Sequence, residues 1–431
     1  MKEFQTIKEA MSQGKGRVNI RGWVYRERGN KNIQFIVLRD AQHIIQCVVE
    51  KLVVGEDMFE QASKVQIETA MSITGDIVAD KRAPSGFEIK VKELEIIGDC
   101  DTFPIAKDNS PEFLLDIRHL ALRTRKQAAI LRIRSSYVQA REQFFKEKDF
   151  FRFDAPILQP NQSEGGSTLF SVNYYKEKTF LSQSWQLYAE AAVSALERIY
   201  NFGPTFRAEK SKTSRHLSEF WMAEMEAAWF DLNDIISFAF EELKFCIQQT
   251  VKERKEDFIL LGQDPQALLE MCDKEWPVMK YREALSLIKE KENMDIPFGK
   301  DLRTEEEKAL MNHFDTPVAV THYPVKAMAF YKPRDPQFPD EALCVDILSP
   351  TGVEITGGSQ RSMDIEDMKK RLQAEDEDPA NYQWYFDTRI YGGVPHSGYG
   401  IGTERVIQWI TGTENIKDCI PFPRTMLRWS P

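Results

Sequence analysis

The sequence predicts an α+β protein with two domains. In the first hundred residues, apolar and polar side chains alternate in short runs, which is typical of half-buried strands. The longer remainder contains strand-like runs interrupted by blocks of helical periodicity. This order favours an antiparallel sheet with helices to one side over a doubly wound parallel sheet, in which strands and helices would alternate regularly.

The first domain contains five strand-like runs with one helix among them. The runs cover residues 18–24, 33–38, 44–49, 71–78 and 87–91 onward, and a polar helix-like segment at 56–65 lies between the third and the fourth. This arrangement predicts an OB-fold β-barrel over residues 1–100. OB folds bind single-stranded nucleic acid by stacking its bases on aromatic side chains. The turn-forming residues of 101–124 predict a hinge linker.

The second domain is predicted over residues 125–431, with a helical insert at about 231–315. We expect helices over 125–148, 187–200, 231–257, 264–271 and 366–374. We expect strands around 151–158, 178–183, 204–209, 219–229, 317–322, 326–331, 342–348 and 353–358. The last strand and helix form a glycine-rich element near residue 400.

Composition narrows the class of protein. The net charge of −10 argues against nucleic-acid binding by the chain as a whole, yet residues 1–40 carry nine Lys and Arg against four acids. No apolar run is long enough to span a bilayer, and the start lacks the apolar segment of a secretory signal, so we expect a cytoplasmic protein without membrane contact. The six cysteines never form C-x-x-C and are expected to be buried free thiols.

An arginine and a glutamate stand in alternating register before a polar loop. Arg207 and Glu209 share a face if residues 206–209 are extended, and the chain returns through an apolar run that contains Phe220. An arginine can grip a phosphate or carboxylate with two donors, a carboxylate can accept from an exocyclic amine, and an aromatic ring offers a stacking surface. This hairpin therefore predicts part of a pocket for ATP.

A second element far downstream strengthens that prediction. Alternate glycines from Gly398 to Gly402 lead into Glu404 and Arg405 at the start of an apolar helix. Glycines in a strand let a ligand approach the backbone closely. No G-x-x-x-x-G-K-[ST] sequence occurs, and the strand–GxGxxG–helix context of a dinucleotide site is absent, so this would be a different kind of nucleotide site. Alternatively, Arg405 could simply pair with Glu404.

These two segments resemble motifs 2 and 3 of the class II aminoacyl-tRNA synthetases, and residues 125–156 resemble motif 1. Further segments resemble the Asp/Asn subgroup, and within it the asparagine-specific enzymes: Ser163-Glu164-Gly165-Gly166, Gln183-Ser184-Trp185-Gln186-Leu187-Tyr188, Arg215-His216-Leu217-Ser218-Glu219-Phe220, Gly357-Gly358-Ser359-Gln360-Arg361 and Pro421-Phe422-Pro423-Arg424. The resemblance extends over nearly the whole chain. It implies ATP-dependent ligation of L-asparagine to tRNA(Asn) through an asparaginyl-adenylate, and a homodimer.

The resemblance also implies roles at the ATP site. Arg207 would bridge the α-phosphate and the amino-acid carboxylate, and Glu209 would accept from the adenine amine. Phe220 and Arg405 would cover the two faces of adenine, with Arg405 also reaching the γ-phosphate. The motif 2 loop would add contacts to the γ-phosphate or the tRNA acceptor end, from Arg215 and His216. The reaction needs positioning and electrostatic stabilisation rather than a protein nucleophile.

Two acids are expected to hold Mg²⁺. Asp346 and Glu354 lie on neighbouring strand-like runs joined by a Pro-Thr-Gly turn. Two carboxylates facing each other across a hairpin repel unless a cation lies between them, and Mg²⁺ prefers carboxylate and phosphate oxygen. The resemblance makes Glu354 the main ligand and Asp346 a supporting one. A solvated pair of acids is the alternative.

The choice of amino acid is expected to depend on five residues. By resemblance, Glu164, Gln186 and Glu224 would hold the α-ammonium group, and Arg361 would donate to the side-chain carbonyl. Aspartate-specific enzymes carry a lysine after Gln-Leu-Tyr, where this chain has Ala189 followed by Glu190. A carboxylate accepts hydrogen bonds from an amide and repels another carboxylate, so Glu190 would favour asparagine.

Two positions depart from the family pattern. Trp185 replaces a small residue or proline and could either narrow the amino-acid pocket or pack behind it. Thr403 stands where an apolar residue or glycine is common. Neither change removes a charged group.

The barrel is expected to read the anticodon. By resemblance, Phe35 and Gln46 match the family residues that stack on and hydrogen-bond the central anticodon uridine, and Arg26 and Arg28 would contact the anticodon backbone or bases. Phe35 could instead be a core residue, and the two arginines plain solvated surface. An alternating polar residue such as Gln46 is harder to explain as core.

Three other functions stay open at this point. The chain could be an aspartyl or nondiscriminating aspartyl-tRNA synthetase, which Ala189 and Glu190 disfavour. It could be a tRNA-independent asparagine-forming amide ligase, which the N-terminal barrel disfavours. A noncatalytic anticodon-binding regulator would be expected to have lost Arg207, Glu209, Glu354 or Arg405, and all four are present.

Overall fold

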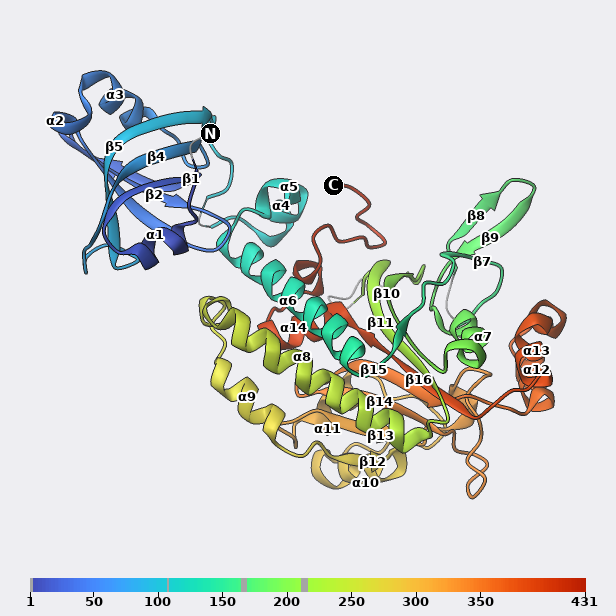
Figure 1. The fold of residues 1–431 in the computed structure, drawn as a ribbon. Helices are drawn as coiled ribbons and strands as arrows, with labels where there is room; N and C mark the ends of the chain where they lie inside the picture. Colours follow the sequence, from blue (N-terminus) through green and yellow to red (C-terminus); the bar gives the residue numbers. More distant parts are fainter. Residues whose placement is uncertain (1–2, 107, 164–168, 211–215) are drawn as a thin grey trace. The chain divides into compact units, whose positions relative to one another are not determined.

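The computed structural model describes residues 3–106, 108–163, 169–210 and 216–431. The chain forms two compact units, Met1–Leu115 and Asp116–Pro431. Figure 1 shows the barrel in blue and the larger unit from teal to red. No helix in the described part of the chain combines the length and the apolar character that a bilayer crossing requires.

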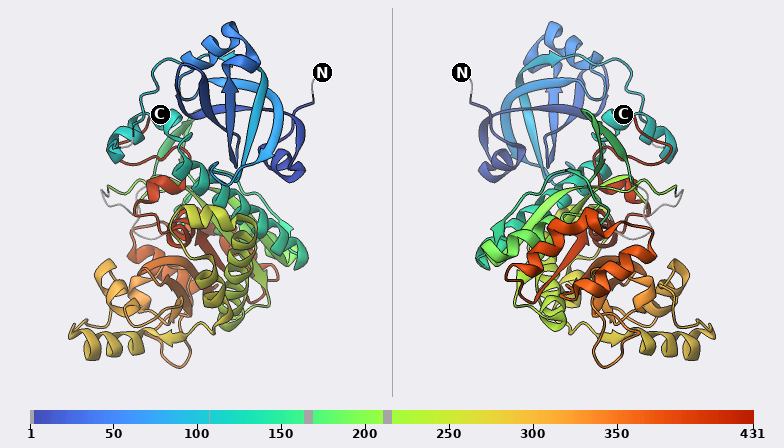
Figure 2. Two further views of the ribbon diagram at one scale, coloured as in Figure 1. Left: turned by 90° about the vertical axis from the view of Figure 1, so that its left-hand side faces the viewer. Right: turned by 90° about the vertical axis from the view of Figure 1, so that its right-hand side faces the viewer.

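The first unit is a closed five-stranded barrel, as predicted. Its strands pair in the order β1-β2-β3-β5-β4, antiparallel except for β3 with β5. They are β1 (Gly16–Gly29), β2 (Ile33–Arg39), β3 (Ile44–Glu50), β4 (Ala70–Ala79) and β5 (Phe87–Gly98). The predicted helix between the third and fourth strands is α3 (Glu56–Lys64), preceded by α2 (Lys51–Val54), and α1 (Ile7–Gln13) comes before the barrel. Figure 2 shows the barrel from two sides.

Side-chain alternation separates the barrel core from its outer face. Ile36 and Leu38 of β2 are fully buried in the apolar interior. Phe35 and Val37 alternate with them and therefore face outward. Phe35 is half-buried and is not part of the core cluster, so the outward face of β2 carries an available aromatic ring.

The second unit is built on an eight-stranded sheet with the order β12-β13-β14-β15-β16-β11-β10-β6. All pairs are antiparallel except β12 with β13 and β10 with β6, which confirms the α+β prediction. The strands are β6 (Phe151–Arg152), β10 (Arg198–Phe206), β11 (Glu219–Ala228), β12 (Val278–Lys280), β13 (Val318–Thr321), β14 (Cys344–Ser349), β15 (Val353–Gln360) and β16 (His396–Gly402). A small sheet contains β7 (Leu158–Gln159), β9 (Glu177–Leu181) and β8 (Ser171–Tyr174).

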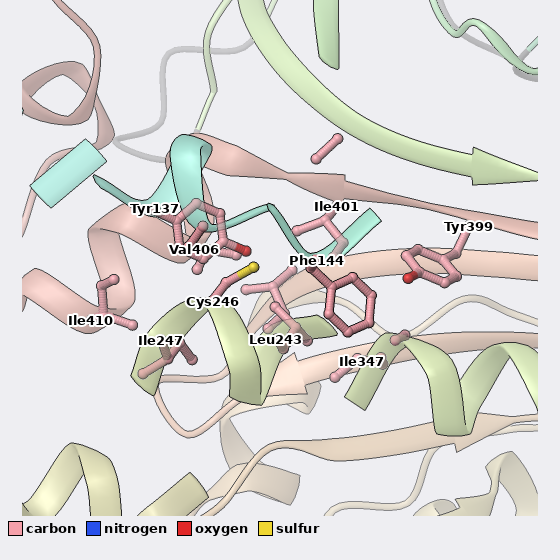
Figure 3. Packing of buried hydrophobic residues seen from close by; sticks show 14 of the residues in the cluster. Tyr137, Phe144, Leu243, Cys246, Ile247, Ile347, Tyr399, Ile401, Val406 and Ile410 are labelled. Carbon is pink, nitrogen blue, oxygen red and sulfur yellow. The ribbon is translucent and has the colours of Figure 1, made fainter. Parts of the chain in front are cut away.

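Three helices pack on one face of the large sheet. They are α6 (Arg125–Glu147), α8 (Leu232–Leu260) and α14 (Thr403–Thr411), and Figures 1 and 2 show them side by side. Their apolar faces meet alternate sheet residues such as Ile347 and Ile401 in one core, seen closely in Figure 3. Because side chains alternate along a strand, the intervening residues of β11, β14 and β16 point to the opposite face of the sheet.

The remaining helices surround this sheet. They are α4 (Pro111–Asp116), α5 (Arg118–Ala121), α7 (Gln186–Leu196), α9 (Pro265–Asp273), α10 (Tyr281–Glu292), α11 (Thr304–Met311), α12 (Ile365–Ala374) and α13 (Gln383–Ile390).

Three predicted elements are wrong. The strand expected over 151–158 is not continuous, because only Phe151–Arg152 and Leu158–Gln159 form strands and they belong to different sheets. The helix expected over 187–200 ends at Leu196, because Glu197 adopts a left-handed φ of 58° and the next residues pair as β10 with β6 and β11. The strand expected over 326–331 does not form. A short 3₁₀ turn lies there instead, and Arg371 donates to the carbonyl groups of Val325, Met328 and Ala329, which occupies the acceptors that a strand would offer to a neighbour.

Candidate active site

A cavity of about 340 Å³ lies on the sheet face opposite the three helices. Its walls come from the β10–β11 hairpin, from β14, β15 and β16, and from the segment around residues 327–332. Met222, Glu224 and Glu226 of β11 line it. Of the intervening residues, Ala223 and Ala227 belong to the core under the helices, and Met225 belongs to that core and also borders the cavity. The alternation of β11 thus places both of these acids on the cavity side.

Arg207 and Arg405 both line this cavity, as predicted. Arg405 Nη1 donates to the backbone oxygen of Glu354 at 2.8 Å and to its Oε2 at 3.1 Å. Burial opposes ionisation of Glu354, but Arg405 and then Arg207 hold the pKa of this carboxyl below its ordinary value. The alternative pairing of Arg405 with Glu404 is not observed, because Glu404 accepts from Arg134 Nη2 at 2.9 Å.

Arg207 is presented just after β10 ends at Phe206. Its backbone N–H donates to Ser218 O at 3.0 Å, which extends the hairpin by one residue. Its guanidinium lies 5.5 Å from the centre of the Phe220 ring. Arg207 Nε is buried and has no hydrogen-bond partner among the described residues. A buried donor without an acceptor costs free energy, so this arginine is suited to an anionic ligand in the cavity.

The other predicted nucleotide residues divide into two groups. Glu209, His216 and Phe220 line the same cavity. Arg215 lies outside the described residues.

Acidic residues gather at one end of the cavity, where Asp301, Asp346 and Glu354 line the wall with Lys332. Burial, and secondly the charge of Glu354, raises the pKa of Asp346 well above its ordinary value. The same two causes raise the pKa of Asp301 to about 6. Such crowding favours a bound cation. No group of three or more His, Cys, Asp or Glu in the described ranges is arranged to hold a metal by itself.

A buried ion pair forms another part of the cavity wall. Arg361 donates from Nε to Glu226 Oε1 at 2.9 Å and from Nη2 to Oε2 at 2.8 Å, and its Nη1 donates to Ser359 Oγ at 2.8 Å. Sequence reasoning identified Arg361 but missed Glu226. The sequence did contain a signal for Glu226, because this residue follows Glu224 by two positions on a strand and must share its face.

The predicted ammonium-binding residues Gln186 and Glu224 line the cavity. Glu224 accepts from Ser184 Oγ at 2.7 Å and from the Trp185 backbone N–H at 3.2 Å. Glu164 lies outside the described residues.

Glu190 lies behind the wall rather than in it. It is buried and is not among the residues that line the cavity. The predicted direct contact between Glu190 and asparagine is therefore corrected to a position behind the wall. The reason is helical geometry: Glu190 follows Gln186 by one turn of α7, and Gln186 Nε2 donates to Glu190 Oε1 at 2.8 Å. Gln186 faces the cavity, and Glu190 supports it.

The two departures from the family pattern lie in packed surroundings. Trp185 borders the cavity, but its ring packs in a small core cluster with Ala189 and Val193, and its Nε1 donates to Phe153 O at 2.7 Å. Of the two alternatives, the indole packs behind the pocket. Thr403 is fully buried at the start of α14 and does not line the cavity.

The four predicted anticodon residues lie on three neighbouring strands of the barrel, β1, β2 and β3. Arg28 pairs with Phe35 across β1 and β2, and its guanidinium lies 5.1 Å from the ring centre. Gln46 is buried and donates to Glu88 Oε2 at 3.0 Å. Arg26 is exposed, and its guanidinium lies 5.2 Å from the ring of Tyr25.

An OB-fold barrel followed by an antiparallel sheet that carries paired arginines, glycines and acids on its open face is the architecture of a class II aminoacyl-tRNA synthetase. Residues 110–426 match the family of class II tRNA synthetases for D, K and N, and residues 18–97 match the OB-fold nucleic acid binding domain. Among known proteins, the chain is 43% identical to the asparagine–tRNA ligase of Pelotomaculum thermopropionicum and 41% to that of Thermus thermophilus, with at least 96% of each chain covered.

The solved structures agree with these sequence matches. Asparaginyl-tRNA synthetase from Pyrococcus horikoshii, complexed with asparaginyl-adenylate, superposes with a TM-score of 0.96 at 39% identity, and both chains are covered completely. The chain therefore belongs to the asparaginyl-tRNA synthetase family.

Proposed function

We propose that this enzyme ligates L-asparagine to tRNA(Asn) in two steps. The asparagine carboxylate first attacks the α-phosphate of ATP, giving asparaginyl-adenylate and pyrophosphate. The terminal adenosine of the tRNA then takes the asparaginyl group. The observation that supports this most strongly is that Arg207, Glu209, Phe220 and Arg405 line the same cavity as the Arg361–Glu226 pair.

Arg207 is proposed to act at the reacting atoms. Its unpartnered Nε and its place in the wall of the cavity suit a bridge between the α-phosphate and the asparagine carboxylate. Such a bridge aligns the two reactants and stabilises charge that grows on the phosphate. Glu209 and Phe220 would bind adenine, and Arg405 would contact its other face and the γ-phosphate.

Mg²⁺ is proposed to bind at the acidic end, held by Glu354 with help from Asp346. The residues fit this ion, because crowded carboxylates without a complete protein ligand set are what Mg²⁺ uses together with phosphate oxygens. Bound there, the ion would supply electrostatic stabilisation of the pyrophosphate leaving group. Lys332 would add a fixed positive charge to the same end.

Asparagine is proposed to be selected by Arg361 and Glu226. Arg361 can donate to the side-chain carbonyl, and Glu226 retains lone pairs that can accept from the side-chain NH₂. Gln186 and Glu224 would hold the α-ammonium group. An aspartate side chain would place its carboxylate against Glu226, which is unfavourable in a buried site.

The barrel is proposed to bind the anticodon of tRNA(Asn). Phe35 offers a ring on the outward face, with Arg28 beside it, and Gln46 and Arg26 belong to the neighbouring cross-strand positions. Aromatic stacking with a few hydrogen bonds is the usual way in which this fold binds single-stranded nucleic acid.

Assembly and location follow from the family as proposals. We propose a homodimer, supported by the motif 1 resemblance and by the exposed Phe151 on the short edge strand β6. We propose a cytoplasmic enzyme, supported by the free cysteines that the structure describes.

The decisive experiment is ATP–pyrophosphate exchange with asparagine and aspartate side by side, followed by charging of tRNA(Asn). We expect exchange with asparagine and transfer to the tRNA. Exchange with aspartate alone would establish the aspartyl alternative. Comparable exchange with both amino acids would establish a nondiscriminating enzyme. Ammonia-dependent formation of free asparagine from aspartate would establish the amide ligase. The absence of exchange with either amino acid would establish the noncatalytic regulator.

A further inference from the structure

A buried cluster of charged side chains lies directly behind the amino-acid end of the cavity. Glu190 of α7 is at its centre and is 3% exposed. Its Oε2 accepts from Arg389 Nη2, from Tyr385 Oη at 2.7 Å and from His396 Nε2 at 3.0 Å. These partners come from α13 and from the start of β16, so three separate elements converge on one carboxylate.

His396 faces acceptors with both of its ring nitrogens. Nδ1 lies 2.7 Å from Val394 O, and Nε2 lies 3.0 Å from Glu190 Oε2. His396 is therefore a second hydrogen-bond partner of Glu190 beside Arg389. Burial opposes ionisation of Glu190, yet Arg389, His396 and Arg361 hold its pKa well below the ordinary value.

The other oxygen of Glu190 faces the cavity wall. Oε1 accepts from Gln186 Nε2 at 2.8 Å, and it lies 3.8 Å from Arg361 Nε. The first contact fixes the amide of Gln186 so that its Oε1 remains free to accept from a ligand. The second places a further negative charge near Arg361 Nε, the nitrogen that also donates to Glu226 Oε1. Glu190 thus links the two halves of the amino-acid site.

We propose that Glu190, held by Arg389 and His396, is a positioning residue that sets the preference for a neutral amino-acid side chain over an anionic one. This inference rests on the proposed function of the cavity. Glu190 and Glu226 together balance the positive charges of Arg361 and Arg389. A carboxamide ligand leaves that balance intact, whereas a carboxylate ligand adds an uncompensated negative charge to a desolvated site. Discrimination against aspartate therefore depends on a residue that does not touch the substrate.

The test is Glu190→Gln, which keeps the shape of the side chain and removes its charge. The readout is the ratio of kcat/KM for asparagine to kcat/KM for aspartate in pyrophosphate exchange. We expect the ratio to fall about tenfold or more, with a rise in kcat/KM for aspartate itself, because the uncompensated positive charge favours a carboxylate ligand. A ratio equal to that of the wild type would overturn the inference. If the wild-type enzyme itself does not activate asparagine, the proposed function fails instead.

Glu242→Gln is the matched control. Glu242 is also fully buried and paired with an arginine, Arg141, but under the sheet in the helix layer. The Glu242→Gln variant is expected to be less stable than the wild type and to keep the wild-type ratio of the two kcat/KM values. Arg389→Gln tests the opposite sign and serves even if Glu190→Gln does not fold: it removes a positive charge from the same carboxylate and is expected to raise the ratio. A fall in that ratio would contradict the proposed charge balance.

Discussion

Arg207 and Arg405 both lower the pKa of the Glu354 carboxyl, although about two hundred residues separate the two arginines in the chain. One arginine follows β10, the other begins α14, and both side chains line one cavity. The sheet brings them together because β11 and β16 are neighbours. This convergence underlies the nucleotide site that we propose.

Arg207→Ala is expected to lower asparagine-dependent pyrophosphate exchange by at least about 10²-fold, the scale of losing one preorganised donor at a developing charge. Binding of tRNA should change little, because the proposed anticodon contacts lie in the barrel. Arg198→Ala, at an exposed position at the start of β10, is the control and should exchange normally. Equal activity of the two variants would show that Arg207 takes no part in the reaction.

Phe35→Ala is expected to weaken tRNA binding by about 1–3 kcal/mol, the value of one lost base stack. Pyrophosphate exchange without tRNA should remain at the wild-type rate. Leu52→Ala, which alters a fully exposed residue of the same domain, should affect neither property. A cooperative loss of barrel structure on substitution of Phe35 would instead show that the ring stabilises the fold.

Asp346→Asn is expected to stabilise the ligand-free protein at neutral pH. The pKa of Asp346 is raised above its unfolded value by burial and by Glu354, so its ionised form costs stability. We therefore expect Asp346→Asn to raise the free energy of unfolding at neutral pH. The gain should vanish as the pH falls below the ordinary pKa of an aspartate, where the carboxyl is protonated in both the folded and the unfolded protein.

The same variant tests the proposed magnesium site. Asp346→Asn should need more Mg²⁺ than the wild type for half-maximal exchange, because a supporting ligand has lost its charge. An unchanged magnesium dependence would leave Glu354 as the sole proposed protein ligand.

Trp185→Phe is expected to lower the free energy of unfolding by about 1 kcal/mol, because the hydrogen bond from Nε1 to Phe153 O is lost. The KM for asparagine should stay near the wild-type value, because the ring packs among Ala189 and Val193. A large change in KM would mean that the indole shapes the pocket after all.

Sequence periodicity predicted the barrel and the antiparallel sheet well, because alternation along a strand is a local property. The same logic placed Arg207 and Phe220 at one site, and it would have found Glu226 had it been applied beyond Glu224. Asp301 was missed because it lies in an irregular segment where no periodicity indicates direction. Glu190 was expected to contact the ligand and lies behind the cavity wall instead, since only the packing of α13 and β16 shows what surrounds it.

The most direct test of the nucleotide site is a single-turnover measurement of adenylate formation from asparagine and α-labelled ATP. It compares the wild type, Arg207→Ala, Arg405→Ala and the double variant. If both arginines bind one nucleotide, the wild type forms asparaginyl-adenylate, each single variant loses most of this activity, and the double variant loses much less than the product of the two effects. Adenylate formation at the wild-type rate in either single variant would contradict the convergence of Arg207 and Arg405 on one ATP molecule.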